Sequence, residues 1–327
     1  MVKLGDVINV HYGKALKADQ RVSNGSVHVF GSSGIVGNHD KTLCSYPTII
    51  IGRKGSVGAI TWAPDGGWII DTAYYVEIKD NNKLDLRYLF YILSGIDLTK
   101  KTITTSIPGL NRDDLYDTFI KLPPFEEQKR IVDLLDKAEG IRQKREQAIK
   151  LADDFLRATF ATMYGNPITN PKKWPVHLMG EIIEFKGGNQ PPKSDFIFEP
   201  KQGYIRLVQI RDFKSDKYAT YIPQEKAKRI FEVDDVMIAR YGPPVFQILR
   251  GLSGSYNVAL MKASPKENIR KGFIFYLLQL PEYHDVVVKN SERTAGQTGV
   301  NLELLNKFNV PLPPIYYQDE ILARLAR

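Results

Sequence analysis

Short runs of β-branched and aromatic residues alternate with Gly, Ser and Asn turns along most of the chain, and this pattern predicts short β-strands. The clearest runs are residues 46–51, 68–70, 74–78 and 204–210. Apolar stretches near residues 85–94 and 270–280 predict one short helix in each half of the chain. We therefore expect an α+β protein made of mixed α/β domains.

The middle of the chain has a different pattern, without turn signals. Pro123-Pro124 predicts an extended entry, and Glu126-Glu127 place negative charge in a first helical turn, where the helix dipole favours it. The next stop signal is Gly165-Asn166-Pro167. One helix of roughly 60 Å is therefore predicted across residues 123–165, at about 1.5 Å per residue.

Apolar and small residues recur along this helix at the heptad spacing of a coiled coil. The stripe and its neighbouring row contain Ile131, Leu134, Leu135, Ala138, Ile141, Ala148, Ala152 and Phe155. The small alanines let a second helix approach closely. The stripe predicts a partner helix, supplied by another chain or by self-association.

The two halves of the chain repeat one another in four places, in the same order. The repeat includes an apolar run that ends in Arg-x-Gly, and its tightest block is Leu-Pro-Pro-x-x-x-Gln, which recurs after 190 residues. The matching pairs are 4–13 with 179–188, 49–55 with 236–242, 88–93 with 273–278, and 110–128 with 300–318.

The repeat divides the chain into two copies of one domain, which differ by loop insertions. We predict a first domain at 1–122, a spacer helix at 123–165, a second domain at 166–311 and the start of a second helix at 312–327. That second helix has only about four turns before Arg327, so we expect that the rest of the coiled coil is either missing or comes from another chain.

The net charge is +8 over 327 residues, and its distribution follows this division. Residues 1–124 contain 14 Lys+Arg against 12 Asp+Glu, residues 125–165 contain 8 of each, and residues 166–327 contain 23 against 17. The basic excess lies in the two flanking domains, which suits a polyanionic partner.

Composition narrows the class of protein further. No run approaches the 18 or so apolar residues of a membrane span, and the start does not resemble a signal peptide. The single cysteine, Cys44, cannot form an internal disulfide. These features lead us to expect a cytoplasmic protein with no membrane partner.

Two domain copies that each end in Leu-Pro-Pro-x-x-x-Gln resemble the specificity (S) subunit of type I restriction-modification enzymes. The likeness extends over essentially the whole chain. It rests on residues 122–132, on the repeat at 312–318, and on the segments 31–37, 51–58 and 71–76.

The resemblance implies two target-recognition domains, each of which recognises half of a split double-stranded DNA sequence. It also implies methylation and restriction subunits as partners. The chain itself would be non-catalytic and would bind no cofactor, whereas S-adenosylmethionine, ATP and Mg would serve the partner subunits. Compact relatives, in which one DNA-binding chain serves a combined cleavage-methylation enzyme, are an open alternative.

Polar, Gly-containing loops supply the candidate DNA contacts, because Arg and Lys favour guanine edges and Asn and Gln favour adenine. Arg53 and Arg240 recur in both copies, which favours a shared structural role or a phosphate contact over base recognition. The candidates are Arg53, Lys54, Ser56, Ser106, Asn111 and Arg112 in the first copy, and Arg240, Tyr241, Gln297, Thr298 and Asn301 in the second.

Two other classes of function fit parts of the sequence. Asp65, Glu77 and Lys79 fit a loose metal-dependent nuclease pattern, but the second copy offers no matching carboxylate. The five histidines show no metal-ligand spacing, and no glycine-rich nucleotide loop is present. A protein scaffold that used the helix alone would leave the Arg, Asn and Gln loops without a role.

Overall fold

The computed structural model describes residues 1–101, 109–242, 244–291 and 299–326. The chain forms two compact units, Met1–Glu146 (unit 1) and Gln147–Arg327 (unit 2). The longest helix, α4 (Phe125–Tyr164), begins in unit 1 and ends in unit 2. Among the described residues, no helix combines the length and the apolar character that a membrane span needs.

Unit 1 is a mixed α/β domain with short strands. Its strands are β1 (Val2–Lys3), β2 (Ile8–Tyr12), β3 (Val27–Gly31), β4 (Gly34–His39), β5 (Thr48–Gly52), β6 (Ile60–Ala63), β7 (Trp68–Ile69), β8 (Ala73–Ile78) and β9 (Phe119–Ile120). Its helices besides the first part of α4 are α1 (Leu4–Val7), α2 (Leu86–Ser94) and α3 (Arg112–Tyr116).

The main sheet of unit 1 has the strand order β2-β8-β5-β6, and its paired strands are antiparallel. Every residue of β5 is buried, as expected for an apolar strand covered on both faces. One face packs with α2 and α3 around Ile51, Leu89 and Leu115. A second sheet, β4-β3-β7, joins the other face through a smaller cluster that includes Phe30 and Ile50.

Unit 2 repeats this construction. Its strands are β10 (Val176–Leu178), β11 (Ile183–Gly187), β12 (Tyr204–Val208), β13 (Tyr221–Pro223), β14 (Ile230–Phe231), β15 (Val236–Ala239), β16 (Ile248–Leu249), β17 (Gly254–Tyr256), β18 (Leu260–Pro265) and β19 (Asn309–Pro311). Its helices besides the last part of α4 are α5 (Met179–Ile182), α6 (Lys271–Leu277), α7 (Pro281–Ser291), α8 (Leu302–Asn306) and α9 (Ile315–Leu325).

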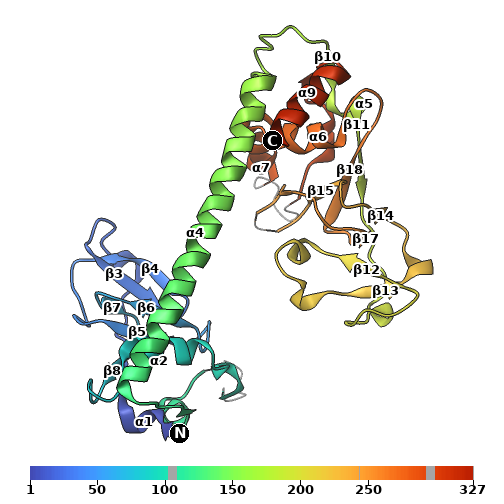
Figure 1. Ribbon diagram of the computed structural model, residues 1–327. Helices are drawn as coiled ribbons and strands as arrows, with labels where there is room; N and C mark the ends of the chain where they lie inside the picture. Colours follow the sequence, from blue (N-terminus) through green and yellow to red (C-terminus); the bar gives the residue numbers. More distant parts are fainter. Residues whose placement is uncertain (102–108, 243, 292–298, 327) are drawn as a thin grey trace. The chain divides into compact units, whose positions relative to one another are not determined.

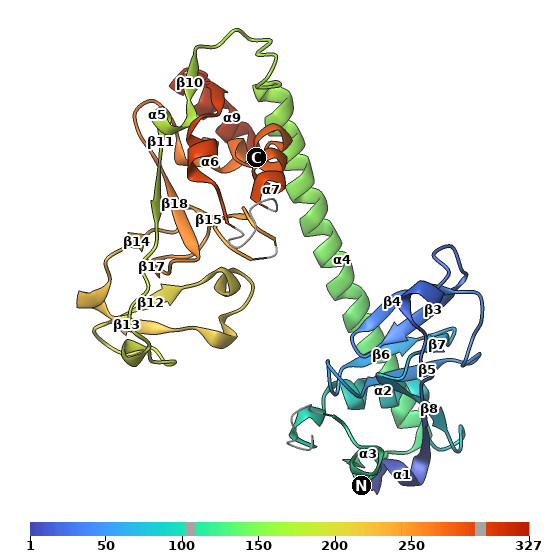
Figure 2. The ribbon, with the colours of Figure 1, turned by 180° about the vertical axis from the view of Figure 1, so that it is seen from behind.

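The main sheet of unit 2 has the order β11-β18-β15-β16, which is the order of unit 1 in corresponding strands. Helices α6, α7 and α9 gather beside this sheet, whereas β12, β13, β14 and β17 form a second lobe at the other end of the unit (Figures 1 and 2). In both units the second sheet contains one parallel pair, β3 with β7 and β12 with β17. The predicted α+β fold of two repeated domains with a long helix is confirmed.

The repeated glutamine of the Leu-Pro-Pro-x-x-x-Gln motif is fully buried in both units. Gln128 Nε2 donates to Lys83 O (2.7 Å) and Pro123 O (2.9 Å), and Gln128 Oε1 accepts from Asp85 N (2.9 Å). Gln318 makes the same three bonds, to the carbonyls of Asn268 and Pro313 and from Arg270 N. The motif therefore holds the start of α4 against the loop that precedes α2, and the start of α9 against the loop that precedes α6.

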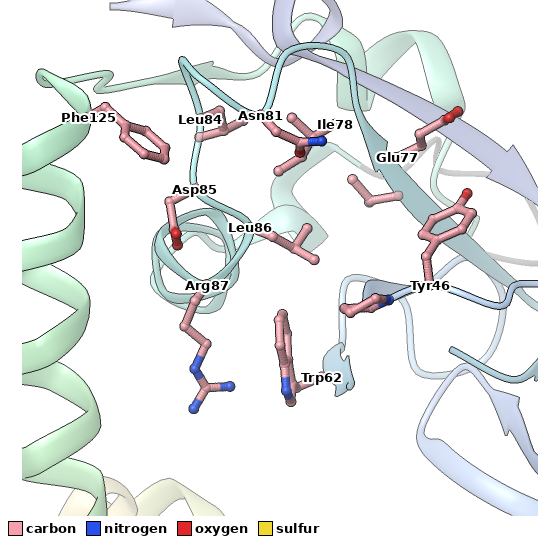
Figure 3. Close-up of a pocket in the computed structure, with 12 residues that line it drawn as sticks. Tyr46, Trp62, Glu77, Ile78, Asn81, Leu84, Asp85, Leu86, Arg87 and Phe125 are labelled. Carbon is pink, nitrogen blue, oxygen red and sulfur yellow. The ribbon is translucent and has the colours of Figure 1, made fainter. Parts of the chain in front are cut away.

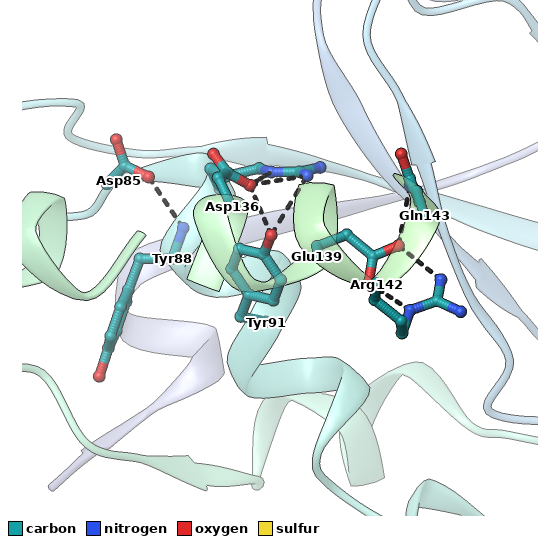
Figure 4. Close-up of polar contacts among 8 residues, drawn as sticks. Asp85, Tyr88, Tyr91, Asp136, Glu139, Arg142 and Gln143 are labelled. Carbon is teal, nitrogen blue, oxygen red and sulfur yellow. Dashed lines mark hydrogen bonds and ion pairs between the residues drawn. The ribbon is translucent and has the colours of Figure 1, made fainter. Parts of the chain in front are cut away.

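A polar contact also holds the first part of α4 against α2 (Figure 4). Tyr91 Oη donates to Asp136 Oδ1 (2.5 Å), and Arg87 Nε donates to the same oxygen (3.0 Å). Beyond this contact, α4 stabilises itself through pairs such as Glu139 with Arg142.

The predicted heptad stripe lies on α4, and its middle is exposed. Leu134 and Phe155 are each 69% exposed, and Ile141, Ala148 and Ala152 are also exposed. Nearer the start, Ile131 packs against the core of unit 1, and Leu135 and Ala138 are half-buried and exposed, respectively. Whether a second helix covers the exposed stretch stays a prediction.

Candidate nucleic-acid interface

In each unit an arginine follows the central strand of the main sheet directly: Arg53 after β5 and Arg240 after β15. The chain then turns sharply through a glycine with positive φ, Gly55 (+77°) or Gly242 (+88°). Glycine adopts such angles without a steric cost. The repeated Arg-x-Gly motif therefore encodes a strand end and a tight turn that present an arginine at one corner of the sheet.

The corner of unit 1 is a cluster of aromatic rings and guanidinium groups. The Arg53 guanidinium lies 5.1 Å from the ring centre of Tyr12 and 5.7 Å from that of Tyr74, and Arg53 Nη1 donates to Asp71 O (3.3 Å). The Arg112 guanidinium lies 5.4 Å from the Tyr12 ring. Tyr12 remains 47% exposed, so a polar, cationic and aromatic surface faces solvent here.

A distant segment of the chain completes this corner. Leu110 N donates to Arg53 O (3.0 Å), and Lys54 forms an isolated bridge with Gly109. Asn111 then caps α3 by accepting from Asp113 N (3.2 Å). These contacts place Arg112, the first residue of α3, beside the end of β5.

Tyr74 also holds the segment that contains Leu110. Its hydroxyl donates to Leu110 O (3.0 Å) and is buried. Burial raises the pKa of Tyr74 to about 12, with a further contribution from Tyr12, while Arg53 opposes the rise. The hydroxyl therefore keeps its proton at neutral pH and remains a hydrogen-bond donor.

The corner of unit 2 is built in the same way. Val300 N donates to Arg240 O (3.1 Å), and Asn301 caps α8 by accepting from Leu304 N (3.1 Å). The Arg240 guanidinium lies 5.1 Å from the ring centre of Tyr241, which is 41% exposed. A Cβ on Gly299 would lie 2.9 Å from Tyr241 Cε1, so this ring packs directly on the glycine backbone.

The structure brings most of the predicted DNA contacts together at these corners. Lys54, Ser56, Asn111 and Asn301 are exposed, and Arg53, Arg112 and Arg240 are partly exposed. Both asparagines are helix caps, which is a structural role that also leaves them at the surface. Ser106, Gln297 and Thr298 lie outside the described residues, and DNA contact by the predicted side chains stays a prediction.

Sequence reasoning missed Tyr12 as a member of the corner. The signal was available, because Tyr12 directly precedes Gly13 of the repeated opening segment.

Two basic residues of unit 2 differ in whether their side chains are accessible to a ligand. Arg206 Nη2 lies 2.7 Å from Asp216 Oδ1 with the arginine largely buried, whereas Arg211 is exposed beside Tyr218.

The three residues of the nuclease alternative have other contacts in unit 1. Glu77 Oε2 lies 2.8 Å from His11 Nε2, and Lys79 Nζ donates to Gly5 O (2.5 Å). Asp65 is exposed in the turn after β6. Over the described residues, no group of three or more His, Cys, Asp or Glu side chains could hold a metal ion.

Glu77 also lines a pocket of about 610 Å³ between β8, α2 and the start of α4 (Figure 3). Its carboxylate points away from Asp85, which lines the same pocket and caps α2 by accepting from Tyr88 N (2.8 Å). Trp62 and Phe125 give the pocket aromatic walls. The two carboxylates do not converge on a common point, as a metal centre would require.

Comparison with known proteins decides the family. A family model described as the type I restriction modification DNA specificity domain matches residues 1–151 and again residues 171–327. The chain belongs to this family. The resemblance drawn from the sequence is confirmed, and the double match agrees with the internal repeat. The family is defined by DNA specificity rather than by catalysis.

Curated relatives of the specificity domain family are distant in sequence. The chain is 22% identical over 320 residues to the type I restriction enzyme EcoBI specificity subunit of Escherichia coli, covering 86% of this chain and 66% of the relative. It is 22% identical over 168 residues to the MjaVIII specificity subunit of Methanocaldococcus jannaschii, covering 51% of this chain and 38% of the relative. The chain thus spans less than two thirds of the length of these relatives.

A solved structure supports the fold of this specificity-domain chain. The crystal structure of a type I restriction-modification system S subunit from M. genitalium superposes with a TM-score of 0.58 at 16% identity. The superposition covers 99% of this chain and 88% of that protein. At this identity the likeness concerns the fold alone.

Proposed function

We propose that this chain recognises a two-part double-stranded DNA sequence, with unit 1 binding one part and unit 2 the other. The observation that supports the proposal is the repeated corner, where an arginine at the end of the central strand meets an exposed tyrosine and a capped helix. A surface of guanidinium groups and aromatic rings suits DNA, whose phosphates attract the cations and whose base edges accept hydrogen bonds. The basic excess of both flanking regions favours the same partner.

Two separate corners suit a split site. One such surface covers only a few base pairs, and recognition of a second group of base pairs multiplies the specificity of the first. The common frame of the two units lets each present its corner to DNA in the same manner. Different side chains on that frame let each recognise a different sequence.

We further propose that the chain is the specificity component of a type I restriction-modification complex, with methylation and restriction subunits as its protein partners. Catalysis would reside in those subunits, which would use S-adenosylmethionine, ATP and Mg, while this chain contributes no catalytic group or cofactor. The names of the relatives support this assembly, and a DNA partner is consistent with action in the cytoplasm.

The exposed stripe of α4 is the proposed contact with another helix. Leu134, Ile141, Ala148 and Phe155 recur at intervals of seven residues on one side of the helix. A row of apolar side chains in water favours association, either with a partner subunit or between two copies of this chain. Sedimentation of the Phe155→Asp variant should show weaker association than the wild type, and a wild type that sediments as a monomer would contradict self-association.

Selection from random DNA tests the recognition proposal. The full chain is incubated with a pool of random-sequence duplexes, and the bound fraction is sequenced at two salt concentrations. We expect enrichment of a two-part motif with a fixed gap, and weaker binding at higher salt because counterions are released on binding. Equal retention of all sequences at both salt concentrations would contradict the proposal.

A further inference from the structure

The corners of units 1 and 2 can be compared position by position, because corresponding strands have the same register. Tyr12 pairs with Tyr74 across β2 and β8, and Ile51 pairs with Tyr74 on the other side. Gly187 and Ile238 have the same relation to Met261. Tyr12 and Gly187 therefore occupy equivalent positions, as do the arginines that follow β5 and β15.

Several positions of the corner hold the same residue type in both units. They form its frame, since the arginine directly follows the strand, the glycine at positive φ makes the turn, Gly299 leaves room for the Tyr241 ring, and the asparagine caps the following helix. These shared positions include Arg53 and Arg240, Gly55 and Gly242, Gly109 and Gly299, and Asn111 and Asn301.

Three neighbouring positions hold different residues in the two units. Lys54 and Tyr241 follow the shared arginine in the chain, and Tyr12 and Gly187 lie against its guanidinium group. Arg112 and Leu302 come two residues after the amide that donates to the carbonyl of the arginine. These variable positions are Tyr12 and Gly187, Lys54 and Tyr241, and Arg112 and Leu302.

The exchange changes what each corner offers to a ligand. In unit 1 the exposed tyrosine comes from β2. In unit 2 that position is Gly187, where a Cβ would lie only 3.1 Å from Arg240 Nη1, so the arginine itself packs over the bare backbone. The tyrosine of unit 2 comes instead from the turn after β15, as Tyr241. Each unit keeps an arginine against a tyrosine but presents the ring from a different side.

We propose, on the basis of the function proposed above, that the variable positions contact base edges and set the sequence preference of each unit. The shared arginines are positioning residues, which hold the tyrosines and contact phosphate. Two domains of one frame that recognise different sequences must differ where they contact bases and can agree where they contact the DNA backbone. The comparison within this one chain separates the two sets.

The chemistry of the variable positions also predicts what each unit prefers. Unit 1 presents two cationic donors, Lys54 and Arg112, and such donors favour the O6 and N7 acceptors of guanine. At the equivalent positions of unit 2, Tyr241 offers an exposed ring and hydroxyl, whereas Leu302 packs against the core of the unit. Apolar groups favour contact with the methyl group of thymine. We therefore assign the guanine-containing part of the motif to unit 1.

The test repeats the selection from random duplexes with single variants of the full chain. Lys54→Ala should lose discrimination at a guanine of one part of the motif by on the order of 10-fold and leave the other part unchanged. Tyr241→Ala should change only the other part. Arg53→Lys should weaken binding to all sequences alike without changing the motif.

Matched controls keep the test specific. Lys83→Ala removes another exposed lysine of unit 1, beyond the opposite end of β8, and should leave the motif unchanged. Thermal melting checks that each variant is folded, which we expect because Lys54 and Tyr241 are exposed.

The outcomes separate this inference from the function on which it rests. A wild type that enriches no motif overturns the proposed function and this assignment with it. A wild type that enriches a two-part motif, together with Lys54→Ala and Tyr241→Ala variants that retain it, overturns the assignment alone. A motif that changes in Arg53→Lys would show that the shared arginine contacts bases, which also contradicts the proposal.

Discussion

Units 1 and 2 share a frame but stabilise its central strand with different chemistry. At the start of β5, Thr48 Oγ1 donates to Val76 O (2.6 Å) across the sheet. The residue 187 positions later is Asp235, a buried carboxylate that lies 2.7 Å from Lys271 Nζ and 3.3 Å from Lys262 Nζ. The strand order survives this exchange of a hydroxyl for an ion pair. The two units therefore share their backbone pairing and their buried glutamine, while the side chains around these features can differ.

The largest effect is expected from the shared glutamines. Gln128→Ala and Gln318→Ala each leave two carbonyls and one amide of the protein without their partner. Each change should destabilise its own unit by about 3 kcal/mol, because unsatisfied buried polar groups cost about 1–3 kcal/mol apiece and water enters part of the gap. Hydrogen exchange of α2 and α6 measures the two effects separately.

Gln143→Ala is the matched control for these variants. Gln143 is an exposed residue of α4 whose amide donates to Glu139 Oε1, so its loss should change stability very little. If only one of the two substitutions destabilises its unit, the two units do not depend on the same hydrogen-bonded glutamine.

A pH-dependent effect should distinguish the two units at the position where they differ. Burial tends to raise the pKa of Asp235, but the hydrogen bond from Lys271, that from Glu232 N and the charge of Lys262 together hold it below its ordinary value. The stability from this group is therefore complete above the unfolded pKa of about 3.9 and is lost as pH falls through the lower folded value. Thr48 does not titrate in this range.

Asp235→Asn should remove that part of the acid sensitivity and cost about 2 kcal/mol at neutral pH, because a charged hydrogen bond is lost. Denaturant unfolding between roughly pH 2 and pH 7, a range that spans the carboxyl pKa, measures both the acid sensitivity and the loss of stability. Asp234→Asn is the control, since Asp234 contacts the same Lys271 from an exposed site. A variant whose stability falls with acid as steeply as the wild type would show that Asp235 does not provide the difference.

The smallest effect is expected at the helix caps. Asn111→Ala and Asn301→Ala should each cost about 1 kcal/mol, because the first turn of α3 or α8 loses a hydrogen-bond acceptor. As frame residues they should leave the selected DNA motif unchanged. Asn290→Ala is the control for stability, because Asn290 is a partly exposed residue of α7 whose side chain bonds only within that helix. A change in base preference with either cap variant would show that these asparagines contact bases and do not serve only as frame residues.

The repeated sequence blocks predicted the shared fold well, because each block marks a local physical requirement. Arg53-x-Gly55 marks a strand end followed by a glycine at positive φ, and the Leu-Pro-Pro-x-x-x-Gln block marks a helix start. The burial of Gln128 was not foreseen. A glutamine near a helix start is usually exposed, and its three partners lie in segments that the sequence alone does not bring together.

The composition of the corner could be predicted only in part. Arg53, Lys54 and Arg112 were recognised as candidates from their loops. Their contact with Tyr12 depends on the register of β2 against β8 and on the bond from Leu110 N to Arg53 O, which connect residues far apart in the chain. The sequence predicts strands at 68–70 and 204–210, where β7 and β12 lie, but not that they belong to a second sheet in each unit, because sheet pairing joins segments far apart in the chain.

The central claim is that each unit recognises one part of a two-part DNA sequence. The most direct test is to express the chain with the methylation subunit proposed as its partner and to map methylated bases in genomic DNA by single-molecule sequencing. The account predicts a motif of two specified parts with a fixed gap, in which the Tyr241→Ala variant alters one part and keeps the other. A single uninterrupted motif, or methylation without sequence preference, would contradict it.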